Sequence, residues 1–134
     1  MSSEACVYAV HFADGSTEQL SLTLLGSGSY RAEESSLVDD SINLGDVISA
    51  EPINEGGIRF LSVSQKSSYT TLRWTISKSA AESDGLPRFL KQVAEVGGLW
   101  EQVMGGLLIL HIPQSSSFDA KREFKRQIGQ SCVG

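Results

Sequence analysis

Long apolar runs, cysteines and histidines are all scarce in this sequence of 134 residues. A membrane-spanning helix needs roughly 20 apolar residues, whereas the longest candidate run, residues 105–112, contains a histidine and stops at Pro113. The N-terminal residues lack the basic segment followed by an apolar one that marks a signal peptide. We therefore expect a cytoplasmic protein that makes no contact with a membrane.

The few cysteines and histidines are placed unfavourably for metal or redox chemistry. Cys6 and Cys132 stand near opposite ends of the chain, a spacing that fits neither a zinc site nor a redox pair. In a reducing compartment two free thiols are more common than a disulfide. His11 and His111 each lack a second His or Cys at ligand spacing. We expect both histidines to be structural residues of strands, and no metal or cofactor to be needed.

Sequence patterns typical of catalysis or nucleotide binding are also missing. A hydrolase serine of the Gly-x-Ser-x-Gly type needs a strand–turn–helix frame, which Gly26-Ser27-Gly28 lacks. Neither a Walker loop nor a G-x-G-x-x-G segment occurs. Carboxylates from distant positions could still converge into a site that no motif reveals. On its motifs, the sequence predicts a protein that is not an enzyme.

Charge is distributed unevenly along the chain, whose net charge is −5. Residues 1–68 carry ten acids and three bases, a balance of −7, whereas residues 69–134 carry eight bases and six acids, a balance of +2. An acidic first half repels phosphate, so generic nucleic-acid binding is disfavoured. One connecting segment is crowded with acids and is either a solvated loop or a docking surface for a basic partner. These acids are Glu33, Glu34, Asp39 and Asp40.

In the first half of the chain, apolar and polar residues alternate as they do in strands, and turn-forming residues separate the alternating segments. Two strand-like segments, 6–13 and 19–25, flank Asp14-Gly15, which is a strong hairpin signal. Further strand-like segments lie within 42–53, 58–65 and 69–77. Short strands at this spacing predict a small curled antiparallel sheet or a barrel.

The pattern changes after Ser79, where apolar residues begin to recur at helical spacing. Asp84 can cap this helix. Two strands joined around Gly105-Gly106 follow, and an amphipathic helix that Ser116 or Ser117 can cap closes the chain. The second half therefore has the order β-α-β-β-α.

These elements predict an α+β protein, with N-terminal antiparallel strands followed by a ferredoxin-like half that lacks its last strand. A strand from the first half could cover the edge left open. Because no stretch resembles a flexible linker, we expect one domain over residues 1–134. Within it, residues 1–66 would form a β-rich subdomain and residues 69–130 a ferredoxin-like one.

Three motifs cross the predicted strands in a fixed order. They are Gly28-x-Tyr30-Arg31, Leu44-Gly45-Asp46-Val47 and Ser67-Ser68-Tyr69-x-Thr71-Leu72-Arg73. Over about residues 30–74, and more weakly beyond, the chain resembles a widespread family of small bacterial proteins known as a domain of unknown function. Ser68-Tyr69 stands where many relatives are expected to have Gly-His. The resemblance implies a bacterial, cytoplasmic protein and supports the fold, and it implies no reaction.

Three residues of these motifs are candidates for contact with an anion or ligand: Tyr30, Arg31 and Arg73. The alternative for Arg73 is an internal salt bridge with Asp46 or Glu33. Asp46 could itself cap backbone N–H groups of a turn, an ordinary role for aspartate.

The preferred function is a non-catalytic interaction protein that binds a cationic partner protein through an acidic face. A bacterial immunity or antitoxin-like inhibitor is one concrete form. The face would comprise Glu33, Glu34, Asp39, Asp40 and Asp46. One alternative is a small-molecule-sensing regulatory domain with a cleft between its halves. Another is an RNA-binding protein that uses the basic residues of the last helix, Lys121, Arg122, Lys125 and Arg126.

Overall fold

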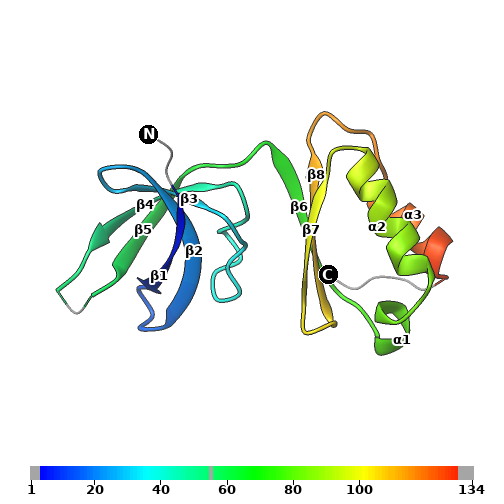
Figure 1. The fold of residues 1–134 in the computed structure, drawn as a ribbon, viewed down its shortest axis with the longest axis horizontal. Coiled ribbons are helices and arrows are strands. Elements are labelled where there is room, and N and C mark those ends of the chain that lie inside the picture. Colours follow the sequence, from blue (N-terminus) through cyan, green and yellow to red (C-terminus); the bar gives the residue numbers. More distant parts are fainter. Residues whose placement is uncertain (1–3, 55, 130–134) are drawn as a thin grey trace. The chain divides into compact units, whose positions relative to one another are not determined.

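The computed structural model describes residues 4–54 and 56–129 and divides into two compact units, Met1–Ser67 and Ser68–Gly134. Unit 1 is a β-barrel, and unit 2 is a three-stranded sheet with three helices (Figure 1). The predicted α+β class, with mostly antiparallel strands, is confirmed. The expectation that both units form one cooperative domain stays a prediction.

Five strands form the barrel of unit 1, in the order of the sequence. They are β1 (Ala5–His11), β2 (Thr17–Gly26), β3 (Ser29–Ala32), β4 (Val47–Pro52) and β5 (Ile58–Gln65). Consecutive strands pair antiparallel, whereas β1 and β5 close the barrel as a parallel pair in which Val10 lies opposite Ile58. In an up-and-down order of five strands, the first and last necessarily run the same way. Only a parallel pair can therefore close this barrel.

The predicted hairpin at Asp14-Gly15 is confirmed. Gly15 has a φ of +90°, a conformation that glycine adopts without steric cost. The Asp14 carboxylate accepts a hydrogen bond from the Ser16 N–H at 2.9 Å, and the Phe12 N–H donates to the Ser16 carbonyl at 2.9 Å. Local turn chemistry thus fixes the register of β1 on β2.

The barrel interior is a small apolar core. Inward-facing residues alternate with exposed ones along the strands, as in Leu20 and Leu22 of β2, which are 1% and 0% exposed. The core residues are Val10, Leu20, Leu22, Tyr30, Ala32, Ile42, Ile48, Ala50 and Ile58. Ile42 belongs to no strand, so the β3–β4 connection is anchored in the core as well.

Unit 2 has an antiparallel sheet in the order β6-β8-β7, with α1, α2 and α3. The elements are β6 (Tyr69–Thr75), α1 (Lys78–Ala81), α2 (Gly85–Glu95), β7 (Leu99–Val103), β8 (Leu107–Pro113) and α3 (Ala120–Ile128). In the described part of the chain every strand of the first half belongs to the barrel. The expectation that one of them covers an edge of this sheet is wrong, and the ferredoxin-like arrangement stays a prediction.

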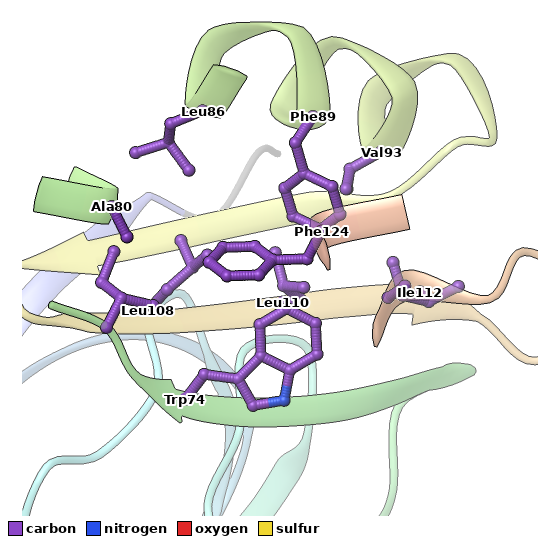
Figure 2. Packing of buried hydrophobic residues seen from close by; sticks show 11 residues of the cluster. Trp74, Ala80, Leu86, Phe89, Val93, Leu108, Leu110, Ile112 and Phe124 are labelled. Carbon is purple, nitrogen blue, oxygen red and sulfur yellow. The ribbon is translucent and has the colours of Figure 1, made fainter. Parts of the chain in front are cut away.

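Aromatic rings fill the core of unit 2, on the face of the sheet that the helices cover. Figure 2 shows Trp74 of β6, Phe89 of α2 and Phe124 of α3 converging on one another. Ring centroids lie 5.4 Å apart for Trp74 and Phe124 and 5.3 Å apart for Phe89 and Phe124. Central strand β8 contributes Leu108 and Leu110, both fully buried. The helical spacing predicted from the sequence places Phe89 on this buried side of α2.

Helix capping differs from the sequence prediction at both longer helices. Asp84 precedes α2 but makes no side-chain cap bond, and the Ser83 hydroxyl instead accepts from the Gly85 N–H. Asp119 caps α3 by accepting from the Arg122 N–H at 3.1 Å, so the prediction of a serine cap at 116 or 117 is wrong. The left-handed Gly129 ends α3, with a φ of +78°.

Candidate functional site

The barrel carries an open groove of about 580 Å³. Three segments line it: the β1–β2 turn at residues 12–14, the β3–β4 connection at 37–40, and Phe60 and Leu61 of β5. We call this surface the barrel groove. All three segments belong to unit 1, so the fold of the barrel alone forms the groove.

Apolar side chains dominate the groove although they face solvent. Leu37, Val38 and Leu61 are 55%, 46% and 52% exposed, and the rings of Phe12 and Phe60 pack together with centroids 5.8 Å apart. A single exposed leucine is unremarkable, but a cluster of apolar residues in a hollow is typical of an interaction surface.

The loop that presents Leu37 and Val38 is held by hydrogen bonds. Glu18 of β2 accepts from the Ser36 hydroxyl and, at 2.8 Å, from the Leu37 N–H. The Ser36 hydroxyl oxygen accepts from the Val38 and Asp39 N–H groups at 3.2 and 2.9 Å. The backbone that presents the two apolar side chains is therefore held in place before any partner arrives, which lowers the entropic cost of binding.

The rim of the groove is acidic. Asp14, Asp39 and Asp40 are its only charged lining residues, and no Lys or Arg lines it in the described part of the chain. Hydrogen bonds from the Ser16 hydroxyl and N–H hold the pKa of Asp14 below its usual value. The Asp39 carboxylate accepts from the Ser41 N–H at 2.9 Å, and Asp40 is exposed. The groove thus combines apolar contact with negative charge.

Three of the five predicted partner-binding acids accept hydrogen bonds from distant residues of unit 1. Glu33 accepts from the Thr23 hydroxyl at 2.7 Å and from Arg31 Nε at 2.8 Å. Glu34 accepts from the Ser21 N–H at 2.7 Å.

Asp46 is the third, with only 1% exposure. Its carboxylate accepts from the N–H groups of Asn43 and Ser67 at 2.9 and 2.8 Å, and Lys66 Nζ lies 3.5 Å away. The structure therefore brings only Asp39 and Asp40 of the predicted face to the groove.

The environment of Glu33 makes barrel stability depend on pH. Burial raises the pKa of Glu33, but hydrogen bonds from Thr23 and Arg31 and the positive charge of Arg31 outweigh burial, so the pKa lies below its ordinary 4.5. A depressed pKa in the folded state stabilises the fold above pH 4.5, and this stabilisation is lost as the pH falls through the lower folded value.

We expect Glu33→Gln to lower the urea midpoint of unfolding at pH 7 more than at pH 3, because at pH 3 the wild-type protein has itself lost part of the carboxylate's contribution. Glu51→Gln is the control, since Glu51 is a half-exposed acid 3.4 Å from Arg59. An equal loss at both pH values would contradict the role given to Glu33.

The predicted ligand residues do not converge within unit 1. Tyr30 is 5% exposed and packs edge-on against Tyr8, with ring centroids 5.3 Å apart. Arg31, next in the strand, points outward, where 47% of its side chain is exposed and its Nε contacts Glu33. Arg73 belongs to β6 of unit 2. Tyr30 is therefore a core residue, and Arg31 pairs with an acid of its own barrel.

Both histidines accept or donate hydrogen bonds within their sheets. His11 Nδ1 lies 3.3 Å from the Thr17 hydroxyl. His111 is fully buried, with Nε2 at 2.8 Å from Glu101 Oε2 and Nδ1 at 2.9 Å from the Thr71 hydroxyl. Thr71 belongs to β6 and Glu101 to β7, so the two ring nitrogens of His111 are held by side chains from both neighbouring strands. His111 thereby links all three strands of unit 2.

No group of three His, Cys, Asp or Glu side chains is arranged to hold a metal ion in residues 4–54 and 56–129. Cys6 is an exposed free thiol. Cys132, which would be the partner of Cys6 in a disulfide, lies outside the described residues. Within the described ranges, no helix is long and apolar enough to cross a bilayer.

A match to a family model shows to which protein family the chain belongs. The model for the domain of unknown function DUF4265 matches residues 18–131, which include all three sequence motifs. The chain belongs to this family. The resemblance predicted from the sequence is thereby confirmed at the level of family membership. Comparison with curated proteins gives no match.

A solved structure shares the fold of this family member. It is a crystal structure described as that of a hypothetical protein from Neisseria gonorrhoeae, with a TM-score of 0.58 and 15% sequence identity. The similarity covers 88% of this chain and 80% of the other. At this sequence identity the comparison supports the mixed α+β fold and gives no information about function.

Sequence reasoning missed most of the barrel groove. The sequence places Asp14 in a turn, and no motif marks Leu37, Val38 or Leu61 as part of a site. One signal was present: Leu37-Val38 is an apolar pair directly before Asp39-Asp40 in a connecting segment with no strand pattern. The contributions of Asp14 and Leu61 come from distant segments and depend on barrel closure.

Proposed function

We propose that the protein is a non-catalytic interaction module whose barrel groove binds a segment of a partner protein that carries basic and apolar side chains. One observation carries the proposal: an ordered loop holds Leu37 and Val38 in solvent beside Asp39 and Asp40. Keeping apolar side chains exposed has no benefit for folding, whereas a partner's apolar residue would remove them from water.

Charge complementarity selects the kind of partner. Among the described residues, the groove lining has three aspartates and no base, and residues 1–68 carry a balance of −7. A lysine- or arginine-bearing segment would gain from this potential in both association rate and specificity. An immunity or antitoxin-like inhibitor is one concrete form, because a small acidic protein can occupy the cationic site at which a toxin binds an anionic substrate.

The basic residues of α3 give weaker support to RNA binding. Arg122 and Arg126 lie 3.8 and 3.7 Å from the carboxylate of Glu123. Part of the positive charge on this helix is therefore balanced within the helix itself.

Paired variants test the barrel groove directly. In extracts of the native organism at low salt, we expect the tagged protein to capture a stoichiometric partner. Asp40→Lys or Leu61→Ser should weaken this capture at least roughly tenfold, a loss of about 1.4 kcal/mol. Raising the salt to about 1 M, where the Debye length is about 3 Å, should weaken it further. Affinity is then measured by calorimetry with the purified partner.

Two controls match the groove variants in chemistry but lie outside the groove. Glu51→Lys reverses a half-exposed acid of the barrel, and Leu24→Ser removes a leucine that is 46% exposed. Both should bind the partner as the wild type does. Equal losses in the controls and the groove variants would refute the assignment of binding to this groove.

A further inference from the structure

A second groove, of about 620 Å³, lies in unit 2 between the start of α2 and strand β7. We call it the Trp100 groove, after the aromatic residue of β7 that lines it. Leu86, Pro87 and Leu90 supply apolar lining from α2, and Glu82 and Asp84 supply carboxylates from the α1–α2 connection. None of these residues belongs to the barrel groove, so this surface is independent of the function proposed above.

Trp100 is unusually accessible for a tryptophan. It is 39% exposed, whereas Trp74, the other tryptophan of unit 2, is 1% exposed and fills the core. Tryptophan beside a hollow is among the commonest anchors of binding surfaces. Its indole face is also the best aromatic partner for a cation.

The carboxylate of Asp84 is not used by its own helix. Asp84 stands at the N-cap of α2, but its backbone is helical and its side chain makes no cap bond. The Ser83 hydroxyl instead accepts a hydrogen bond from the Gly85 N–H. Glu33 and Asp46 accept hydrogen bonds from other residues of unit 1, whereas the exposed Glu82 and Asp84 line a groove.

Strand β7 adds a backbone edge to this groove. In the order β6-β8-β7, strand β7 pairs with β8 on one side, and no strand of residues 4–54 and 56–129 pairs with it on the other. An extended polypeptide can add to such an edge through main-chain hydrogen bonds, while pockets beside the edge read its side chains. A strand added to β7 would run directly past Trp100.

We infer that the Trp100 groove binds an arginine side chain of an extended polypeptide segment that pairs with the edge of β7. The planar guanidinium stacks on the indole of Trp100 and donates to the carboxylates of Glu82 and Asp84. Lysine fits less well, because a compact ammonium can neither stack nor donate in a bidentate fork. Lys91 also lines the groove and opposes an incoming cation, so its removal should strengthen binding.

The test uses three short peptides of the form Thr-Val-X-Val-Thr, in which X is arginine, lysine or citrulline. Because the chain has two tryptophans, its ¹⁵N spectrum has two indole N–H signals, and Trp100→Phe assigns them. The arginine peptide should shift the Trp100 indole and the β7 amides, with Trp74 unmoved. Citrulline, which keeps the shape of arginine without its charge, should bind at least roughly tenfold more weakly.

Substitutions of the lining residues test the role of each one in binding the arginine peptide. Asp84→Asn and Trp100→Ala should weaken the arginine peptide at least roughly tenfold, and Lys91→Gln should tighten it by a few fold. Glu95→Gln, an exposed acid at the end of α2 outside the groove, should leave affinity unchanged. The position of the Trp74 indole signal reports whether each variant keeps its core. An unmoved Trp100 indole, or equal binding of the citrulline peptide, would overturn the proposal. Indole shifts without any β7 amide shift would overturn the strand pairing.

Discussion

Replacing Phe89 by alanine is expected to destabilise unit 2 by about 3–5 kcal/mol. The Phe89 ring is fully buried and lies between the rings of Trp74, Phe118 and Phe124, with centroid distances of 6.2, 6.3 and 5.3 Å. Truncation removes these contacts and leaves a cavity that the rigid sheet cannot fill. For a small domain the loss is a large part of a typical total stability of about 5–15 kcal/mol.

Tryptophan fluorescence during urea unfolding measures this effect selectively. Both tryptophans, Trp74 and Trp100, belong to unit 2, so their emission reports the sheet and helices rather than the barrel. Leu99→Ala is the control, because Leu99 is 41% exposed and its truncation should cost well under about 1 kcal/mol. A Phe89→Ala variant with an unchanged midpoint would contradict the packing in Figure 2.

Gly57→Ala is expected to destabilise the barrel by about 3 kcal/mol or more. Gly57 has a φ of +83°, and a Cβ at this position would lie 2.3 Å from the carbonyl oxygen of Ala9. The clash falls on the backbone beside the β1–β5 closure, where neither strand can move without opening the barrel. Circular dichroism during thermal unfolding measures the loss.

The neighbouring glycine provides a matched control. Gly56 has a φ of +88°, but a Cβ there would meet nothing within 4 Å. Gly56→Ala should therefore cost only the strain of the left-handed backbone, about 1–2 kcal/mol. The difference between the two variants isolates the clash, and equal losses would mean that β1 and β5 are not as close as described.

The Gly57→Ala variant also tests whether the chain unfolds as one cooperative domain. If it does, Gly57→Ala in the barrel will also lower the tryptophan midpoint of unit 2. If the tryptophan transition keeps its wild-type midpoint while the barrel unfolds early, the one-domain prediction is wrong.

Local signals in the sequence predicted most of the secondary structure. The hairpin at Asp14-Gly15 and the helix through Phe89 depend on turn chemistry and on the spacing of apolar residues, both of which act over a few residues. Capping was less predictable. Asp84 and Asp119 both precede helices, but Asp119 has an extended backbone whereas Asp84 is already helical, and only an extended N-cap can turn its side chain back to the helix.

The candidate site was less predictable than the fold, because charge can be counted in a sequence and hydrogen bonding cannot. Glu33, Glu34 and Asp46 look like surface acids until folding brings donors from 10, 13 and 21 positions away. Asp40 has the same chemistry and stays exposed. Which acid remains available for a partner is therefore decided by the tertiary structure.

The parallel closure of the barrel has a consequence for its synthesis. Strand β1 must wait for β5, the last strand of the unit, before its second edge finds a neighbour. A sheet of β1 to β4 without β5 would have two open edges, at which a strand from another chain could pair. The pairing of β5 with β1 removes both edges at once, so protection against edge-to-edge association depends on the last strand of the unit.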